Sequence, residues 1–305
     1  RSGAFHPRWH VRAAAVSRAS PRITRIEGVS MRQTRRTGGP VAIAYDIKGS
    51  GPLVVFLHGI GGNRHNWAGQ VDYFGAKFCA VAWDARGYGA SDDSPQTLQF
   101  RDYADDLARL LDHLGAARAH LVGLSMGGMI LQDFYSHYPD RVATLSLVDT
   151  SVGFGSVSQE VRRDFLARRL EPLERGLTPA DIAPGVVEVL VAKDANPEAR
   201  QRMRASMEAL RVDSYKQALH AIVTTDLLAA LPHIDVPTLV IVGEEDVVTP
   251  PSDSELLAQR IPGATLVNIP GAGHLTNIEK PQAFNAALET FLHRYAARAS
   301  EVAAS

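Results

Sequence analysis

The stretch that decides the fold is His120-Leu121-Val122-Gly123-Leu124-Ser125-Met126-Gly127, in which an apolar run leads into a Gly-x-Ser-x-Gly pentapeptide and a helical pattern follows. A strand, a sharp turn and a helix in that order are what a nucleophile elbow requires. Glycines two residues before and two after the serine remove side chains that would collide as the chain reverses, and the strained turn lifts the hydroxyl clear of its own backbone. Ser125 is therefore predicted to be a nucleophile.

The rest of the chain must supply a base and an acceptor that orients it, because a serine hydroxyl is a poor nucleophile near neutral pH. The apolar run 239–242 leads into a loop that holds Asp246, and the run 265–269 leads into a glycine-flanked loop that holds His274. Both residues thus follow predicted strands, at the end where open parallel sheets place their chemistry. Ser125, Asp246 and His274 are the predicted catalytic residues, in the chain order expected of an α/β-hydrolase.

Two earlier segments extend the pattern. Residues 58–62, His-Gly-Ile-Gly-Gly, resemble the oxyanion loop of the α/β-hydrolase superfamily, and residues 83–91, Trp-Asp-Ala-Arg-Gly-Tyr-Gly-Ala-Ser, resemble its Asp-x-Arg-Gly-x-Gly-x-Ser segment. The resemblance covers roughly residues 41–297 and is to the cap-bearing members of the superfamily. Within it, Gly-Leu-Ser-Met-Gly-Gly-Met-Ile at 123–130 and Gly-His-Leu-Thr-Asn-Ile-Glu-Lys-Pro at 273–281 look closest to the 3-oxoadipate enol-lactonase and small esterase branch.

The resemblance implies roles for the loop at 58–62 and for its neighbours. The backbone N–H groups of Ile60 and Met126 are the expected oxyanion donors, and Met126 opens a helix whose dipole also favours negative charge. His58 is expected to brace the loop by hydrogen bonds and not to serve as a second base. Trp67 follows the same loop, and two interpretations of it stay open: it borders the substrate pocket, or it caps the core.

Asp246 has competitors for the role of the acid. Glu244 and Glu245 lie in the same loop, and Asp149 ends the strand that follows the elbow helix, a position from which some relatives draw their acid. We favour Asp246 because its loop and the Pro250 that follows match the commoner pattern.

Alternating strand and helix patterns from residue 41 onward predict an α/β protein, an α/β-hydrolase fold with a mainly parallel central sheet and helices on both faces. The core is expected at 39–150 and 227–297, with core-facing helical stripes at 100–114 and 281–295. Between the two halves the strand pattern stops and charge-rich helical segments take over, which predicts a helical cap at 151–226. Residues 298–305 are expected to form a C-terminal tail.

The predicted cap covers the strand ends, where it would exclude water and shape the pocket. Phe154, like Trp67, is a predicted substrate-binding residue, and Val152, Phe165 and Leu166 are candidates for further lining. We expect the arginines of the cap on a solvated face, because spacings of four to acidic residues are those of ordinary surface helices. The alternative is that one of them holds a substrate carboxylate. The cluster comprises Arg162, Arg163, Arg168, Arg169 and Arg175.

The first 38 residues differ from the rest in charge. They hold nine arginines, no lysine and a single acid, Glu27, which leaves 23 basic against 32 acidic residues in the remainder. An arginine- and serine-rich, acid-poor segment is typical of an organellar transit peptide. We favour upstream sequence ahead of a native start at Met31, and expect residues 1–38 to be a disordered extension. The protein is accordingly expected in the cytoplasm, with organellar import as the alternative.

The remaining composition narrows the class of protein. Cys79, the lone cysteine, lies in an apolar run and is expected to be a packed thiol. The chain has neither the Cys/His spacings of a structural zinc site nor an apolar stretch of membrane-spanning length. We expect no cofactor, no metal, no nucleic-acid or membrane partner, and a monomer or small homo-oligomer.

These inferences converge on a serine hydrolase that cleaves a small carboxylic ester or lactone through an acyl-enzyme, with a Ser-His-Asp triad. Four alternatives use the same scaffold: a C–C bond hydrolase, a cofactor-free perhydrolase, an acyltransferase, and a ligand sensor with slow turnover.

Overall fold

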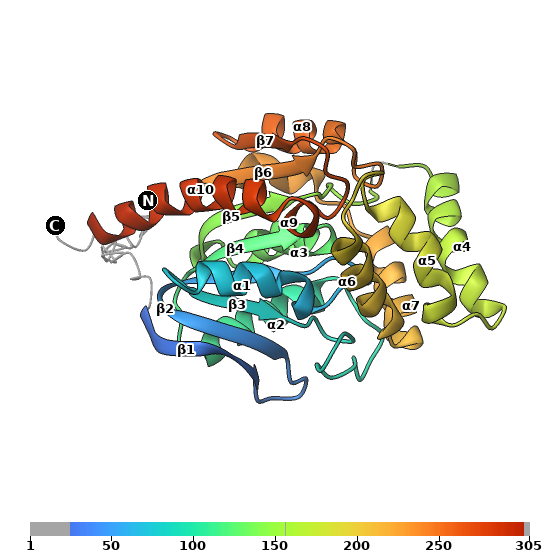
Figure 1. The fold of residues 1–305 in the computed structure, drawn as a ribbon, viewed down its shortest axis with the longest axis horizontal. Helices are drawn as coiled ribbons and strands as arrows, with labels where there is room; N and C mark the ends of the chain where they lie inside the picture. The colour runs from blue at the N-terminus through green and yellow to red at the C-terminus, as the bar shows by residue number, and fades with distance from the viewer. Residues whose placement is uncertain (1–24, 156, 302–305) are drawn as a thin grey trace, which may run out of the picture.

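The computed structural model describes residues 25–155 and 157–301, and within them it shows a seven-stranded sheet (Figure 1). The strand order is β1-β2-β4-β5-β6-β7, and β3 pairs with β2. Neighbouring strands from β2 through β4, β5 and β6 to β7 run parallel, while β1 is antiparallel to β2. The strands are β1 Arg25–Arg36, β2 Ala44–Leu57, β3 Cys79–Trp83, β4 Ala119–Leu124, β5 Val142–Val148, β6 Thr238–Gly243 and β7 Thr265–Ile269.

Helices cover both faces of this sheet, as predicted. One face packs against α2, α3 and α8, and the other against α1 and α10, so that a hydrophobic cluster lies on each side. Strands β3, which is antiparallel to β2, and β4 are buried along their whole length, because helices cover both faces of the sheet. The layer helices are α1 Ala68–Phe74, α2 Arg101–His113, α3 Met126–His137, α8 Pro251–Arg260, α9 Thr276–Glu279 and α10 Pro281–Glu301, with 3₁₀ turns at Arg64–Trp67, Pro139–Arg141 and Leu228–His233.

Four helices between β5 and β6 form a separate layer, which we call the cap: α4 Gln159–Glu174, α5 Pro179–Leu190, α6 Pro197–Glu208 and α7 Val212–Val223. They lie together at one end of the sheet, opposite the end to which α10 runs (Figure 1). The side chains of Ser158, Thr178 and Asn196 accept a backbone N–H at the start of α4, α5 and α6, which satisfies a donor that the helix leaves free. These N-terminal hydrogen bonds therefore stabilise the first turn of three of the four helices.

The two ends of the cap are joined to each other where it leaves the sheet. An isolated antiparallel bridge links Gly153 to Asp226, with hydrogen bonds from Phe154 N to Thr225 O (2.9 Å) and from Leu227 N to Val152 O (2.9 Å). The insertion thus closes at its base.

The N-terminal prediction was wrong for residues 25–36, which form strand β1 and pair with β2; residues 1–24 lie outside the described residues. Met31 lies inside this strand. The arginines that suggested an extension hold the strand in place: Arg32 donates to Asp72 (3.0 Å), and Arg36 pairs with Asp92. An edge strand exposed on both faces lacks the apolar alternation by which strands are recognised. At the other terminus α10 continues to residue 301, so the predicted tail is helical over 298–301.

The lone cysteine, Cys79, is buried, and that burial raises the pKa of its thiol to about 11.

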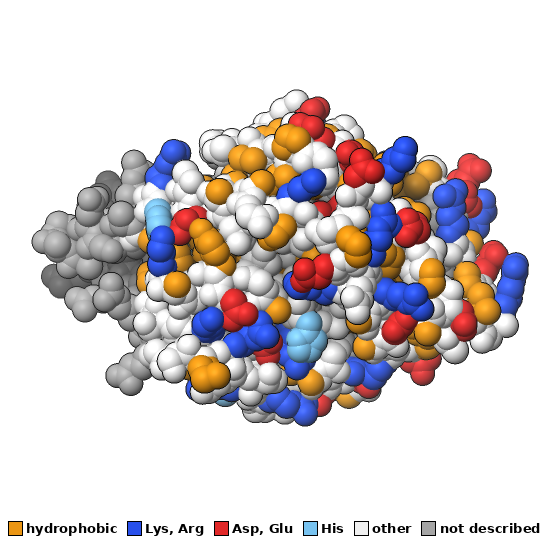
Figure 2. All heavy atoms as spheres, viewed as in Figure 1, with side chains coloured by type: hydrophobic (Ala, Val, Ile, Leu, Met, Phe, Trp, Pro, Cys, Tyr) orange, Lys and Arg blue, Asp and Glu red, His pale blue; other side chains and the backbone are white. Residues whose placement is uncertain are grey.

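On the face drawn in Figure 2, basic and acidic side chains are interspersed and do not form a field of one sign. Within residues 25–155 and 157–301, the helices lack the combination of length and apolar character that crossing a membrane requires. That same part of the chain brings together no group of three or more His, Cys, Asp and Glu side chains able to hold a metal ion.

Candidate active site

The turn between β4 and α3 places Ser125 in a strained backbone conformation, with φ 54° and ψ −118°. The turn is possible only because glycines flank it. A Cβ atom on Gly123 would lie 2.4 Å from the Gly127 carbonyl, and one on Gly127 would lie 2.4 Å from the Leu57 carbonyl. A non-glycine residue at positive φ costs of order 1–3 kcal/mol and persists where the surrounding structure enforces it. The elbow predicted from the sequence is therefore present, and the strain is located at the predicted nucleophile.

His274 and Asp246 come together as the sequence predicted. Nδ1 of His274 lies 2.8 Å from Oδ2 of Asp246, and both side chains are buried. Oδ1 of Asp246 accepts from Val248 N (2.8 Å) and Thr249 N (3.0 Å), and Oδ2 also accepts from the Thr249 hydroxyl (2.8 Å). These three hydrogen bonds from its own loop fix the Asp246 carboxylate independently of its contact with the imidazole.

The electrostatics of this pair favour an imidazole that can take up a proton. Burial acts to lower the pKa of His274, but the charge and the hydrogen bond of Asp246 outweigh it, so that the pKa of His274 is raised above its usual value. Burial acts in the opposite sense on Asp246, yet His274 and the N–H groups of its loop hold the pKa of that carboxyl below its usual range. Each partner stabilises the charged form of the other.

Asp149, the competing acid, lies near this pair but has other partners. Its Oδ1 accepts from Gly243 N (2.9 Å), and its Oδ2 accepts from the backbone N–H (3.1 Å) and the hydroxyl (2.7 Å) of Thr276. Burial and the nearby charge of Asp246 raise the pKa of Asp149 to about 7. Of these two aspartates, Asp246 is the one hydrogen-bonded to the imidazole, whereas Asp149 joins β6 to the segment after His274.

Ser125 and His274 line one cavity of about 330 Å³ between the sheet and the cap. Trp67 and Phe154 line it as well. Both interpretations of Trp67 hold, because its ring is 1% exposed and also packs against Phe56 in the core, with centroids 5.0 Å apart. Val152 and Phe165 are part of the wall, but Leu166 is not: it lies in an open groove on the outer side of α4. The wall is largely apolar and includes Leu124, Met129, Val157, Val186, Leu190, Met203, Met207 and Ile222.

The two expected oxyanion donors both belong to this cavity wall. Ile60 lies in the turn after β2, and Met126 is the first residue of α3, directly after Ser125. Within the described residues, the backbone N–H groups of Ile60 and Met126 have no hydrogen-bond partner. Two unpaired N–H groups beside a serine hydroxyl are the arrangement that stabilises a developing oxyanion.

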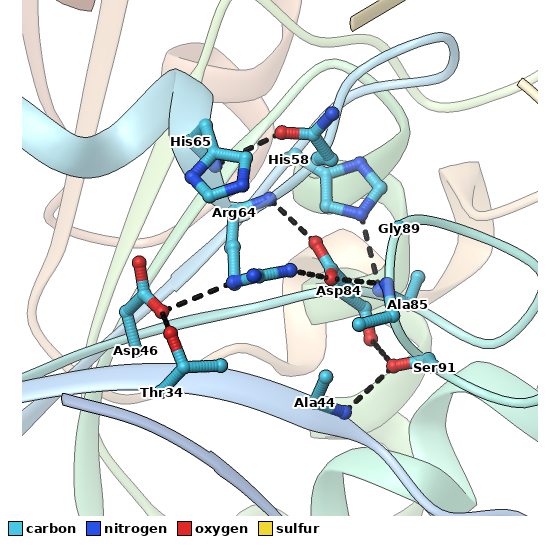
Figure 3. A network of polar contacts seen from close by, with 12 residues as sticks. Thr34, Ala44, Asp46, His58, Arg64, His65, Asp84, Ala85, Gly89 and Ser91 are labelled. Atoms are coloured by element: carbon cyan, nitrogen blue, oxygen red, sulfur yellow. Dashed lines mark hydrogen bonds and ion pairs between the residues drawn. The ribbon is translucent and has the colours of Figure 1, made fainter. Parts of the chain in front are cut away.

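His58 braces the loop that carries Ile60, as expected. Its Nδ1 donates to the Gly59 carbonyl (2.8 Å). Its Nε2 accepts from Ala85 N (3.0 Å), as Figure 3 shows. Burial lowers the pKa of His58, which keeps the ring neutral. With both ring nitrogens engaged, His58 has no free position for proton transfer.

Near His58, a buried network of ion pairs holds Arg64, the first residue of the 3₁₀ turn that follows the oxyanion loop. Arg64 donates to Asp46 (3.0 Å) and pairs with Asp84, whose carboxylate also accepts from Ala90 N (2.8 Å) (Figure 3). Ser91 links the same Asp84 to β2, since it donates to the Asp84 carbonyl (2.6 Å) and accepts from Ala44 N (2.7 Å). The segment 83–91 recognised in the sequence is thus a support for the oxyanion loop.

Of the five cap arginines, Arg162 is half-buried and donates to the Gly155 carbonyl (2.7 Å), and the expectation of a solvated position fails for Arg169. Arg163, Arg168 and Arg175 are exposed, but Arg169 lines the cavity and stacks on Phe165, with its guanidinium carbon 3.7 Å from the ring centroid. Its Nη1 donates to the Phe165 carbonyl (3.2 Å), and no carboxylate of the described residues lies within ion-pairing distance. Arg169 lies four residues after Phe165, a predicted lining residue, and therefore on the same face of the helix. That spacing could have indicated from the sequence that Arg169 faces the cavity.

A strained serine elbow, a buried His–Asp pair and two free N–H groups around one apolar cavity define the class of hydrolases that use a serine nucleophile. Residues 52–281 match the family model of the alpha/beta hydrolase fold, and the chain belongs to this family of enzymes. It is 30% identical over 268 residues to 3-oxoadipate enol-lactonase 2 of Acinetobacter baylyi, covering 85% of this chain and 96% of that protein.

Solved structures agree. A thermophilic esterase from Thermogutta terrifontis superposes with a TM-score of 0.79 at 30% identity, covering 87% of this chain and 99% of that one. The enol-lactonase from Burkholderia xenovorans LB400 gives a TM-score of 0.74 at 29% identity, covering 83% and 97%. The predicted superfamily, and the likeness to its enol-lactonase and esterase branch, are confirmed.

Proposed function

We propose that this protein is a serine hydrolase that cleaves a small carboxylic ester or lactone through an acyl-enzyme, without a cofactor. The observation that carries the proposal is that His274, which is 2.8 Å from the buried carboxylate of Asp246, lies on the wall of the same cavity as the strained Ser125. The likeness to enol-lactonase and esterase relatives supports the substrate class.

In this mechanism Ser125 Oγ attacks the substrate carbonyl while His274 Nε2 takes up its proton. Asp246 accepts a hydrogen bond from the Nδ1–H group, which keeps Nε2 free to act as the base and stabilises the imidazolium that forms. His274 then returns the proton to the leaving alcohol. In the second half-reaction the same imidazole removes a proton from water as the water oxygen attacks the acyl carbonyl, and it gives that proton to Ser125 Oγ as the bond to the acyl group breaks and the acid is released.

The negative charge of each tetrahedral intermediate forms beside Ile60 and Met126. Their backbone N–H groups are held in place before the reaction, by the His58 brace on one side and by the start of α3 on the other. Removing one such donor in a serine hydrolase typically costs about 10²–10³-fold in kcat.

The cavity also supports a limit on the substrate. An apolar wall around about 330 Å³ suits a small acyl or lactone group. Arg169 is the cationic side chain of that wall without an ion-pair partner in the described residues, and a guanidinium binds a carboxylate through two parallel hydrogen bonds. We infer that substrates with a carboxylate remote from the scissile bond are preferred.

The test is turnover of short and medium p-nitrophenyl esters and of several lactones by the wild type and Ser125→Ala, together with labelling by a fluorophosphonate. Hydrolysis that requires Ser125, with one mole of label per mole of active protein, is the expected result. Stoichiometric binding of ligands without turnover would overturn the proposal in favour of a sensor. Hydrolysis that persists in Ser125→Ala would overturn the assignment of the nucleophile.

A further inference from the structure

The loop that holds His274 is in direct backbone contact with the cap. His274 N donates to the carbonyl of Leu190, the last residue of α5, at 2.8 Å. Gly273 approaches so closely that a Cβ atom there would lie 2.5 Å from Ala192 N and 2.7 Å from the Val191 carbonyl carbon. The position of the catalytic histidine therefore depends on where the end of α5 lies.

Glu279, at the end of α9, joins the two sides of this contact. Its Oε1 accepts from Gly273 N (3.1 Å) and Leu275 N (3.1 Å), the residues on either side of His274. Its Oε2 accepts from Ala192 N (2.7 Å), which belongs to the cap. The side chain is 5% exposed, and no basic side chain of the described residues forms an ion pair with it. A buried carboxylate that accepts only backbone N–H groups is costly unless all of them are present.

We infer that Glu279 is a positioning residue that fixes the main chain of His274 to the cap segment 190–192, so that the imidazole is in place when this end of the cap is seated on the sheet. The inference rests on the proposed role of His274 as the base. It also implies that the cap does not open along the α5 side, because such movement would break the bond from His274 to Leu190 and that from Ala192 to Glu279 together.

Replacement of Glu279 by glutamine tests this connection with almost no change of shape. Glutamine has one acceptor oxygen where glutamate has two. If the oxygen stays with Gly273 and Leu275, the amide NH₂ faces the Ala192 N–H and the cap side is lost; if it turns, both bonds beside His274 are lost. Each orientation separates the histidine loop from the cap.

The experiment compares the wild type, Glu279→Gln and Gly273→Ala. The second variant acts from the other side, since its Cβ atom forces Ala192 away from the loop. The matched control is Asp133→Asn, which also exchanges a largely buried carboxylate for an amide but lies near the C-terminal end of α3, outside the cavity wall and 3.4 Å from His137. Steady-state kinetics are measured on the folded fraction, and hydrogen–deuterium exchange is measured in peptides that cover 186–194 and 270–278.

We expect kcat to fall about 10- to 100-fold in Glu279→Gln and Gly273→Ala, with a smaller change in KM, because displacement of a catalytic group by about 1 Å costs that much. Amide exchange should become faster in both peptides together, and the Asp133→Asn enzyme should keep its kcat. Unchanged kcat in the two variants, with only a lower Tm, would show that Glu279 is merely structural.

Hydrogen–deuterium exchange distinguishes a failure of this inference from a failure of the proposed function. If the wild type hydrolyses no ester or lactone, the function fails, but coupled exchange at 186–194 and 270–278 still supports the link. Faster exchange at 270–278 alone would refute it, because Glu279 would then hold the loop without the cap.

Discussion

Asp246→Asn is the substitution whose effect the structure determines most closely. The side chain keeps its shape, so the loop 246–249 is expected to keep its fold. The substitution replaces one carboxylate oxygen by an NH₂ group, so that either this NH₂ group or the remaining oxygen faces Nδ1 of His274. The outcome depends on which of the two groups takes that position.

The loop decides the orientation of the new amide. Oδ1 of Asp246 accepts two backbone N–H groups, from Val248 and Thr249, whereas Oδ2 faces His274 and the Thr249 hydroxyl. An asparagine therefore keeps its oxygen on the backbone side and directs its NH₂ at Nδ1 of His274. The ring must then carry its proton on Nε2, the nitrogen that the mechanism needs as the base.

The magnitude follows from the cost of turning the amide round. The reverse orientation leaves two buried N–H groups unpaired, at about 1–3 kcal/mol each, so about 2–6 kcal/mol holds the asparagine in the inactive orientation. At about 1.4 kcal/mol per tenfold, kcat should fall by at least about 30-fold and by up to about 10⁴-fold. The upper limit is the size of the tautomer effect in a serine protease triad.

The assay is steady-state hydrolysis of an ester that the wild type turns over, with circular dichroism to verify the fold and Asp149→Asn as the control. The control removes a buried aspartate from the same region without touching Nδ1, so its kcat should exceed that of Asp246→Asn. A folded Asp246→Asn enzyme with kcat within about tenfold of the wild type would refute the reasoning, because the amide would then not control the tautomer. A larger loss in Asp149→Asn would assign the acid to Asp149.

Four further outcomes are expected. Arg169→Gln should lower kcat/KM for carboxylate-bearing esters about 10- to 100-fold while sparing neutral ones, the value of a charge-assisted hydrogen bond; equal losses on both would exclude a carboxylate contact. Gly127→Ala should destabilise the fold by about 2 kcal/mol or more in urea titration, because its Cβ would lie 2.4 Å from a β2 carbonyl; an unchanged midpoint would contradict the elbow geometry. Because His274 must be neutral to act as the base and its pKa is raised, kcat/KM should fall as pH drops through a value above about 6.5, and a pH profile of Asp246→Asn should show this limb at lower pH. Cys79, with its raised pKa, should react with a thiol reagent only after unfolding; rapid labelling of the native protein would contradict its burial.

The sequence predicted those parts of the site that depend on short-range geometry. Ser125 needs glycines two residues on either side, and that requirement is visible as a pentapeptide. His274 and Asp246 each follow an apolar strand, so the topology alone indicates that they lie at one edge of the sheet. The fold class was predictable for the same reason, because alternating strand and helix patterns leave few topologies.

The remaining features depend on packing between distant segments. Arg169 faces the cavity because of the way α4 packs against α7, whereas charge spacing along α4 alone indicated a solvent-exposed position. Glu279 belongs to a recognised motif, but its partner Ala192 is 87 residues away on the cap. Strand β1 has polar residues on both faces and forms ion pairs with Asp72 and Asp92. These partners lie far along the chain, so the composition of residues 25–36 does not predict a strand.

The bridge between Gly153 and Asp226 has a consequence for how the pocket can change in evolution. Because the inserted helices leave and re-enter the sheet at adjacent positions, the whole insertion can be exchanged for another of different length or shape while the strand register beneath it is preserved. Ser125 and Asp246 lie outside the exchanged piece, whereas Arg169 and about half of the apolar wall lie within it. Grafting the insertion of a relative at residues 153 and 226 should therefore transfer its substrate preference onto this chemistry, provided that the graft restores a backbone carbonyl for His274 and an N–H group for Glu279.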